Sequence, residues 1–140
     1  MNINEYLKQL EKDDLRIQAI KRKIERLENR AYNLSSKPMD SDRVQKTSNK
    51  DRIADLTVQI MTEKERLERL QDDNEYRIDT LTEHILSIDD PDQSKVLYYQ
   101  LIEQKNCVEI ADTMDKAPKT IHNISTNARK SLAKLFVGNE

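Results

Sequence analysis

Six polar side chains near the C-terminal end of the chain have the types and spacing needed to contact nucleic-acid bases. They are Lys119, Thr120, His122, Asn123, Thr126 and Arg129. Asparagine can make two hydrogen bonds to adenine, arginine can do the same to guanine, and threonine can touch base edges. Phosphate contacts, which position a protein without reading the sequence, are expected from Lys116, Lys119, Lys130 and Lys134. These residues predict an interface for double-stranded DNA.

The same end of the chain is basic, whereas the remainder is acidic. Residues 116–140 hold five Lys and Arg against one acid, a balance of +4. Residues 1–115 hold 19 Lys and Arg against 25 acids, a balance of −6. An acidic remainder repels phosphates and restricts where a polyanion can dock. We therefore expect nucleic acid to bind at the C-terminal end.

Two helices and a short turn are predicted to position these side chains. Asn106 and Glu109 can cap a helix over about 107–114, and Pro118 suits the first position of the next helix. Only residues 115–117 separate the two helices. This is the outline of a helix-turn-helix, whose second helix enters the major groove. The expected inward-facing core residues are Ile110, Ala111, Met114, Ile121, Ala128 and Leu132.

A further helix is predicted immediately before this unit. Asp90 suits the N-cap, Pro91 the first helical position, and Gln93 the reciprocal position of a capping box. The apolar face of this helix would comprise Val96, Leu97, Tyr99, Leu101 and Ile102. Residues 90–136 are thus predicted to form the helix-turn-helix domain.

Residues 1–88 are predicted to form a coiled-coil stem. Helices are expected at about 2–34 and 49–88, with a connector at 35–48 and a helix cap at Ser48. Apolar residues at steps of three and four define a seam in each helix. Polar residues interrupt the seams at Asp14, Glu63 and Asn74, either as devices that fix register or as places where the seam is loose. The two helices could fold into a hairpin or zip with another chain.

The composition favours an all-α protein without catalytic machinery. Charged residues make up 36% of the chain and aromatic residues 4%, with a single glycine. His84, His122 and Cys107 lack the spacing of a metal or nucleophile site. One glycine leaves no phosphate-binding loop, so neither enzyme activity nor a cofactor is expected. The lone cysteine and the lack of a long apolar run predict a cytoplasmic protein.

The stretch VLYYQLIEQKNCVEIADTMDKAPKTIHNISTNARKSL resembles the helix-turn-helix that closes sigma factors. It resembles more closely the C-terminal part of the ArpU/RinA-type late transcriptional regulators of phages of Gram-positive bacteria. The residues that match the pattern are Glu109, Ile110, Ala111, Ile121, Ala128 and Leu132. The connector residues Ser41, Asp42, Arg43 and Val44 are also similar to one subgroup. Departures from the pattern are Cys107 for an aromatic residue, Asp115 for glycine, Lys116 for an apolar residue and Ala117 for the usual cap.

The resemblance implies a phage or prophage transcriptional regulator in the cytoplasm of a bacterial host. Its partners would be double-stranded DNA, RNA polymerase and, through the stem, a second copy of the chain. Two alternatives remain open on the sequence. One is a coiled-coil adaptor or inhibitor that binds a protein such as RNA polymerase. The other is a small terminase-like DNA packaging subunit, although such proteins place the DNA-binding module before the oligomerising helices.

Overall fold

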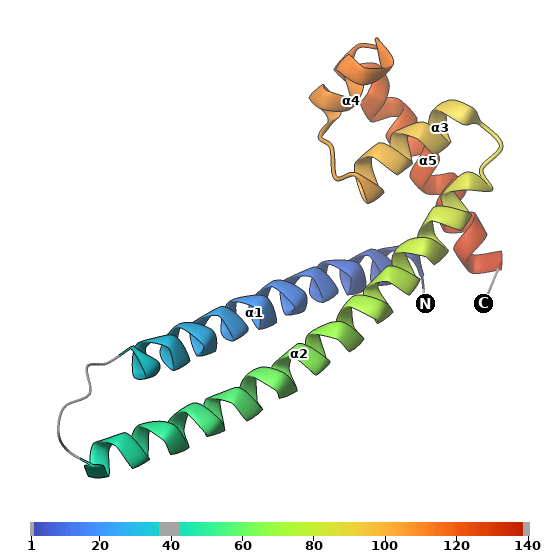
Figure 1. The fold of residues 1–140 in the computed structure, drawn as a ribbon. Helices are drawn as coiled ribbons and strands as arrows, with labels where there is room; N and C mark the ends of the chain where they lie inside the picture. Colours follow the sequence, from blue (N-terminus) through green and yellow to red (C-terminus); the bar gives the residue numbers. More distant parts are fainter. Residues whose placement is uncertain (1, 37–42, 139–140) are drawn as a thin grey trace. The chain divides into compact units, whose positions relative to one another are not determined.

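A computed structural model describes residues 2–36 and 43–138, and every regular element within these ranges is helical (Figure 1). The elements are α1 (Ile3–Ser35), α2 (Arg43–Leu86), α3 (Pro91–Leu97), the π-helix η1 (Tyr98–Ile102), α4 (Cys107–Met114) and α5 (Pro118–Gly138). The predicted all-α class is confirmed.

The second long helix differs most from its predicted boundaries. It begins at Arg43 and ends at Leu86, so the predicted start at residue 49 and the cap at Ser48 are wrong. The segment from residue 43 to Ser48 contains neither proline nor glycine, so nothing in it stops the helix from extending towards its N-terminus. The part of the predicted connector at 37–42 lies outside the described residues.

The chain divides into two compact units. One unit combines residues 1–10 with 75–140, and the other comprises residues 11–74. This division differs from the predicted boundary between residues 88 and 90, because both long helices contribute one end to the unit that holds α3, α4 and α5. We call this first unit the head and the unit of residues 11–74 the stem.

The stem is an antiparallel hairpin within one chain. Lys23 Nζ on α1 donates a hydrogen bond of 2.9 Å to Glu63 Oε1 on α2. Lys64 Nζ lies 4.0 Å from Glu28 Oε1 on the other helix. Buried residues follow α1 at steps of three and four, at Ile17, Ile20, Ile24 and Leu27. Of the two predicted arrangements, the intrachain hairpin is therefore the one observed.

The polar residue in the seam of α1 is Asp13 rather than Asp14. Asp13 is 2% exposed, whereas Asp14 is exposed. The steps from Leu10 to Asp13 and from Asp13 to Ile17 are three and four, which keeps the heptad spacing without a slip. Glu63 is buried on α2 as predicted, and Asn74 is half-buried.

The larger of two apolar clusters in the head joins both ends of the chain. Ile3 from α1 packs with Leu81 and Ile85 from α2 and with Leu132 and Phe136 from α5. The other buried members are Ile88, Leu97 and Ala128. The Tyr6 hydroxyl donates 2.8 Å to the Arg77 carbonyl, and the Phe136 ring lies 5.0 Å from the Tyr6 ring and 4.6 Å from the His84 ring. The first turns of α1 therefore belong to the core of the head.

The smaller cluster lies between α3, α4 and the first turn of α5. Its buried members are Val96, Ile110, Ala111 and Ile121, and Met114 packs against it half-buried. Ala128 and Leu132, which we predicted to share one core with these residues, belong to the larger cluster instead. They lie two and three turns further along α5 than Ile121, where α2 and α1 rather than α4 face the helix.

Candidate nucleic-acid interface

Local capping fixes the turn between α4 and α5. The Asn106 side chain accepts a hydrogen bond of 2.9 Å from the Glu109 amide, and the Glu109 carboxylate accepts one of 3.4 Å from the Asn106 amide, so the predicted capping box is present. α4 ends at Asp115, which adopts the left-handed conformation with φ 55° and ψ 49°. The Lys116 amide then donates 2.9 Å back to the Ala111 carbonyl. Pro118 occupies the first position of α5, which places the two helices in a helix-turn-helix.

The left-handed residue of this turn is expected to limit its stability. Asp115→Gly should raise the free energy of unfolding by about 0.5 kcal/mol, because glycine lacks the Cβ that clashes in this conformation. Asp115→Ala should lower it by about 0.5–1 kcal/mol. Urea denaturation followed by circular dichroism compares the two variants with the wild type. A lower midpoint for Asp115→Gly than for Asp115→Ala would contradict this assignment of the turn.

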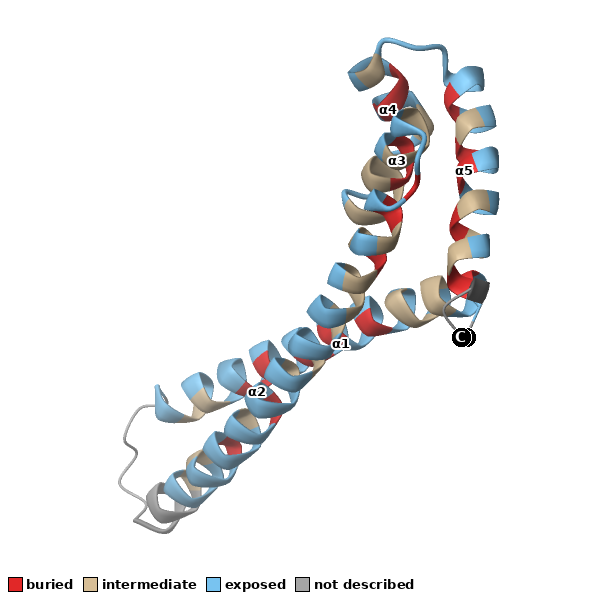
Figure 2. Ribbon diagram, turned by 90° about the vertical axis from the view of Figure 1, so that its right-hand side faces the viewer, coloured by how far each residue is buried: buried red, intermediate tan, exposed pale blue. Residues whose placement is uncertain are grey.

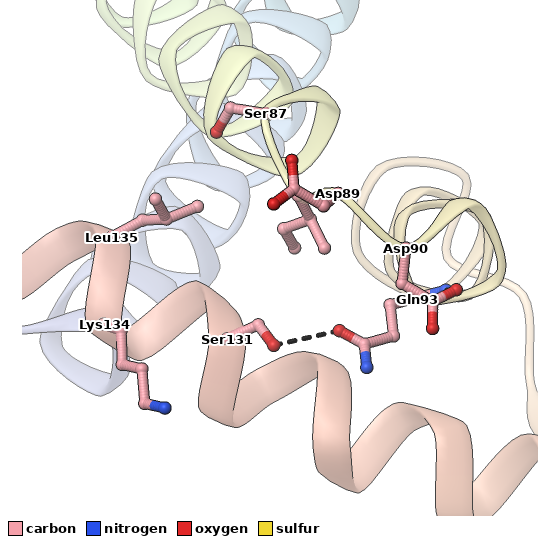
Figure 3. Close-up of a pocket in the computed structure, with 8 residues that line it drawn as sticks. Ser87, Asp89, Asp90, Gln93, Ser131, Lys134 and Leu135 are labelled. Atoms are coloured by element: carbon pink, nitrogen blue, oxygen red, sulfur yellow. Dashed lines mark hydrogen bonds between the residues drawn. The ribbon is translucent and has the colours of Figure 1, made fainter.

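The helix predicted before the helix-turn-helix is observed as α3, which ends at Leu97, followed by the π-helix η1, and one of its predicted cap contacts also differs. The Asp90 side chain caps α3 by accepting hydrogen bonds from the amides of Asp92 and Gln93. The Gln93 side chain, predicted to complete a capping box, instead accepts a hydrogen bond of 2.9 Å from Ser131 Oγ on α5 (Figure 3). Tertiary packing therefore uses Gln93 to hold α5 against α3.

α5 has one buried face and one exposed face (Figure 2). The buried residues follow steps of four and three and are Ile121, Ser125, Ala128, Leu132 and Phe136. All six predicted base-contacting residues are exposed. Lys119, Asn123, Thr126 and Lys130 follow steps of four, three and four, which places them in one row opposite the buried face. Asn127 is exposed beside this row, and its spacing of four from Asn123 could have identified it from sequence.

Arg129 and His122 lie on one flank of the row, and Thr120 lies on the other. Arg129 Nη2 donates 3.3 Å to the Gln100 side-chain oxygen. The same oxygen accepts a hydrogen bond of 2.8 Å from the buried Ser125 hydroxyl. Gln100 lies in η1, so a helix 25 residues upstream of Ser125 orients a predicted site residue. The sequence carries no signal for this contact, because it depends on how η1 packs against α5.

The three remaining lysines occupy different surroundings. Lys116 Nζ lies 3.8 Å from Asp92 Oδ2 of α3. Lys130 borders an open pocket that Ile3, Leu7 and Leu132 also line. Lys134 lines another pocket of about 370 Å³ with Ser87, Asp89, Asp90 and Gln93 (Figure 3). Of the nine predicted site residues, seven therefore lie in the exposed row or on its flanks. The other two, Lys116 and Lys134, have acidic residues near them.

The exposed face of α5 carries positive charge without any acid. From Pro118 to Gly138 the helix contains Lys119, Arg129, Lys130 and Lys134 but neither Asp nor Glu. Hydrogen-bond donors and cations on a rigid helix suit a polyanion whose edges present acceptors. Such a surface can bind a polyanion through its cations and distinguish one pattern of acceptors from another through its hydrogen-bond donors.

The described fold and site define an all-helical protein with a two-helix hairpin and a helix-turn-helix unit. A family model described as "Protein of unknown function (DUF1492)" matches residues 33–133. Because the match covers more than half of the chain, the protein belongs to the DUF1492 family. Neither a curated protein nor a solved structure matches the chain. Among the described residues, no helix combines the length and apolarity that crossing a membrane requires.

Proposed function

We propose that this protein is a DNA-binding transcriptional regulator that inserts the first half of α5 into the major groove. The observation that carries the proposal is the acid-free exposed row of α5, which lies opposite a fully buried face. Lys119 and Lys130 bracket the polar residues Asn123 and Thr126 in this row. In this arrangement the lysines would contact phosphates on either side of the groove while the amide reads a base.

The resemblance of residues 96–132 to the ArpU/RinA-type regulators supports a role in phage or prophage transcription. That role places the protein in the cytoplasm of a bacterial host, beside RNA polymerase and the promoter. The hairpin stem would then carry a second copy or the polymerase. Light scattering on the full chain tests for the second copy.

Selection from a pool of random DNA duplexes, followed by fluorescence titration of the best sequence, tests DNA binding directly. Asn123→Ala is expected to weaken binding by about 1–3 kcal/mol and to relax the preference at one base position. Lys119→Ala and Lys130→Ala should weaken binding equally for all sequences. Each lysine variant should also lower the slope of log K against log salt by about 0.9.

Lys50→Ala is the matched control, because Lys50 is an exposed lysine on the stem. This variant should bind as the wild type does. If the wild-type protein binds no duplex even at low salt, the DNA proposal fails.

A protein partner is the competing proposal, in which the chain acts as an adaptor or inhibitor of RNA polymerase. It is favoured by Val58 and Met61 on α2, which are 63% and 59% exposed and lie about one turn apart. Calorimetric titration of the chain with core RNA polymerase tests for this contact, which Val58→Ser should weaken. The duplex titration distinguishes the two proposals, because an adaptor or inhibitor would bind polymerase but no DNA.

A further inference from the structure

A second basic surface lies on the stem, outside the helix-turn-helix. It consists of five cationic side chains of α1, namely Lys12, Arg16, Arg22, Arg26 and Arg30, which we call the basic stripe. All five are exposed. At 100° per residue they fall on one flank of α1, which extends from beside the line of buried residues Ile17, Ile20, Ile24 and Leu27 to the side opposite that line. Residues 1–115 have a charge balance of −6, so the charge count alone does not reveal this basic surface.

The acids of α1 between Lys12 and Arg30 lie elsewhere on the helix. Asp13 is buried. The Asp14 carboxylate accepts a hydrogen bond from Gln18 Nε2, and Glu28 lies near Lys64 of α2. Together with Glu25, these last two acids lie on the other flank of the helix rather than on the stripe. Within the described residues, none of the five stripe cations forms an ion pair.

This arrangement costs helix stability instead of adding to it. Three pairs of like charge stand four residues apart, namely Lys12 with Arg16, Arg22 with Arg26, and Arg26 with Arg30. Each such pair destabilises a helix by about 0.2–0.5 kcal/mol. Lys23 lies on the same flank but is not counted in the stripe, because its Nζ donates a hydrogen bond of 2.9 Å to Glu63 Oε1. A polyanion bound along the stripe would offset the repulsion between these side chains, because each cation would then lie near a negative charge.

We infer that the basic stripe binds the phosphate backbone of double-stranded DNA, an inference that rests on the proposed function. The stripe spans about 27 Å at 1.5 Å per residue, which equals about eight steps of the DNA backbone at 3.4 Å per strand. Four of its five cations are arginines, whose guanidinium groups bind phosphate through two parallel hydrogen bonds. Because the stripe is inferred to contact phosphates rather than base edges, it adds affinity without sequence preference.

The test uses the full chain with Arg22→Gln, Arg26→Gln and Arg30→Gln combined, titrated with the selected duplex and with a scrambled duplex. The slope of log K against log salt should fall by about 2–3, because about 0.9 is lost per phosphate contact. Binding to both duplexes should weaken by the same factor, about tenfold or more at low salt. Glutamine matches arginine in helix propensity, so thermal unfolding should show equal or higher stability.

The control combines Lys21→Gln, Lys50→Gln and Arg69→Gln, which remove the same charge from exposed positions outside the stripe. It should leave the salt slope within error of the wild type. If the stripe variant and this control bind alike, the inference is overturned while the proposed function stands, and an acidic protein surface becomes the partner to test. If the wild type binds neither duplex, both the inference and the proposed function are overturned.

Discussion

Ile3→Ala is expected to lower the free energy of unfolding of the head by about 2–4 kcal/mol, as severely as a substitution inside the helix-turn-helix itself. Ile3 is 8% exposed and belongs to the same cluster as Leu132, which is fully buried. Removing a buried branched side chain loses its transfer free energy and leaves a cavity. Leu132→Ala should therefore cost about 2–5 kcal/mol. Both variants should then bind DNA weakly, because the head that holds α5 is partly unfolded.

Denaturant unfolding of the full chain, monitored by near-ultraviolet circular dichroism of the tyrosines, measures both losses. Leu15→Ala is the control, because Leu15 lies on the same helix but is 69% exposed. It should change the free energy of unfolding by less than about 0.5 kcal/mol. Equal values for Ile3→Ala and Leu15→Ala would show that the start of α1 does not stabilise the head.

The free energy of unfolding should fall when Lys23 of the stem ion pair is replaced by alanine, and it should rise when its partner Glu63 is replaced by leucine. Lys23→Ala is expected to lower the free energy of unfolding by about 1–3 kcal/mol, because it leaves the Glu63 carboxylate buried without its cation. The Lys23 side chain is 48% exposed and that of Glu63 is 12% exposed. Glu63 Oε2 accepts no hydrogen bond from the described residues, although Arg66 Nη1 lies 3.9 Å away. The cost of burying this carboxylate is therefore only partly offset.

Glu63→Leu should instead raise the free energy of unfolding by about 1–3 kcal/mol. Leucine would continue the seam of Leu56, Ile60, Leu67 and Leu70, and the freed Lys23 can extend into water. A double-mutant cycle with Lys23→Ala measures the coupling between the two side chains. A loss of stability on Glu63→Leu would show that the ion pair itself stabilises the hairpin.

Much of this protein's local structure follows from short-range signals in the sequence. Asn106 with Glu109, Pro118, and Asp90 with Pro91 each act within one helical turn, so the starts of α3, α4 and α5 were predictable to within a residue or so. The stem helices follow from the heptad pattern, which requires only the period of the helix. The start of α2 was mispredicted because a favourable cap at Ser48 competes with continuation of the helix, and local spacing does not decide between them.

The exposed face of α5 was also predictable, since a helix with apolar residues at steps of three and four must expose the others. The partners of that face were not. Gln100 accepts a hydrogen bond from Arg129, Asp92 lies near Lys116, and the Gln93 side chain accepts a hydrogen bond from Ser131 instead of completing the capping box. Each contact joins residues that are distant in the sequence and are brought together only by packing.

The polar face of α5, with its lysines, asparagine and arginine, was therefore determined by the sequence alone, because helical periodicity is a local property. The tertiary structure decided which residues support that face. It placed Ile3 and Leu132 in one cluster and divided the expected single core into two clusters. The free energy gained by burying apolar area does not depend on how far apart two residues lie in the sequence. The first residues of the chain can therefore complete the core around the last helix.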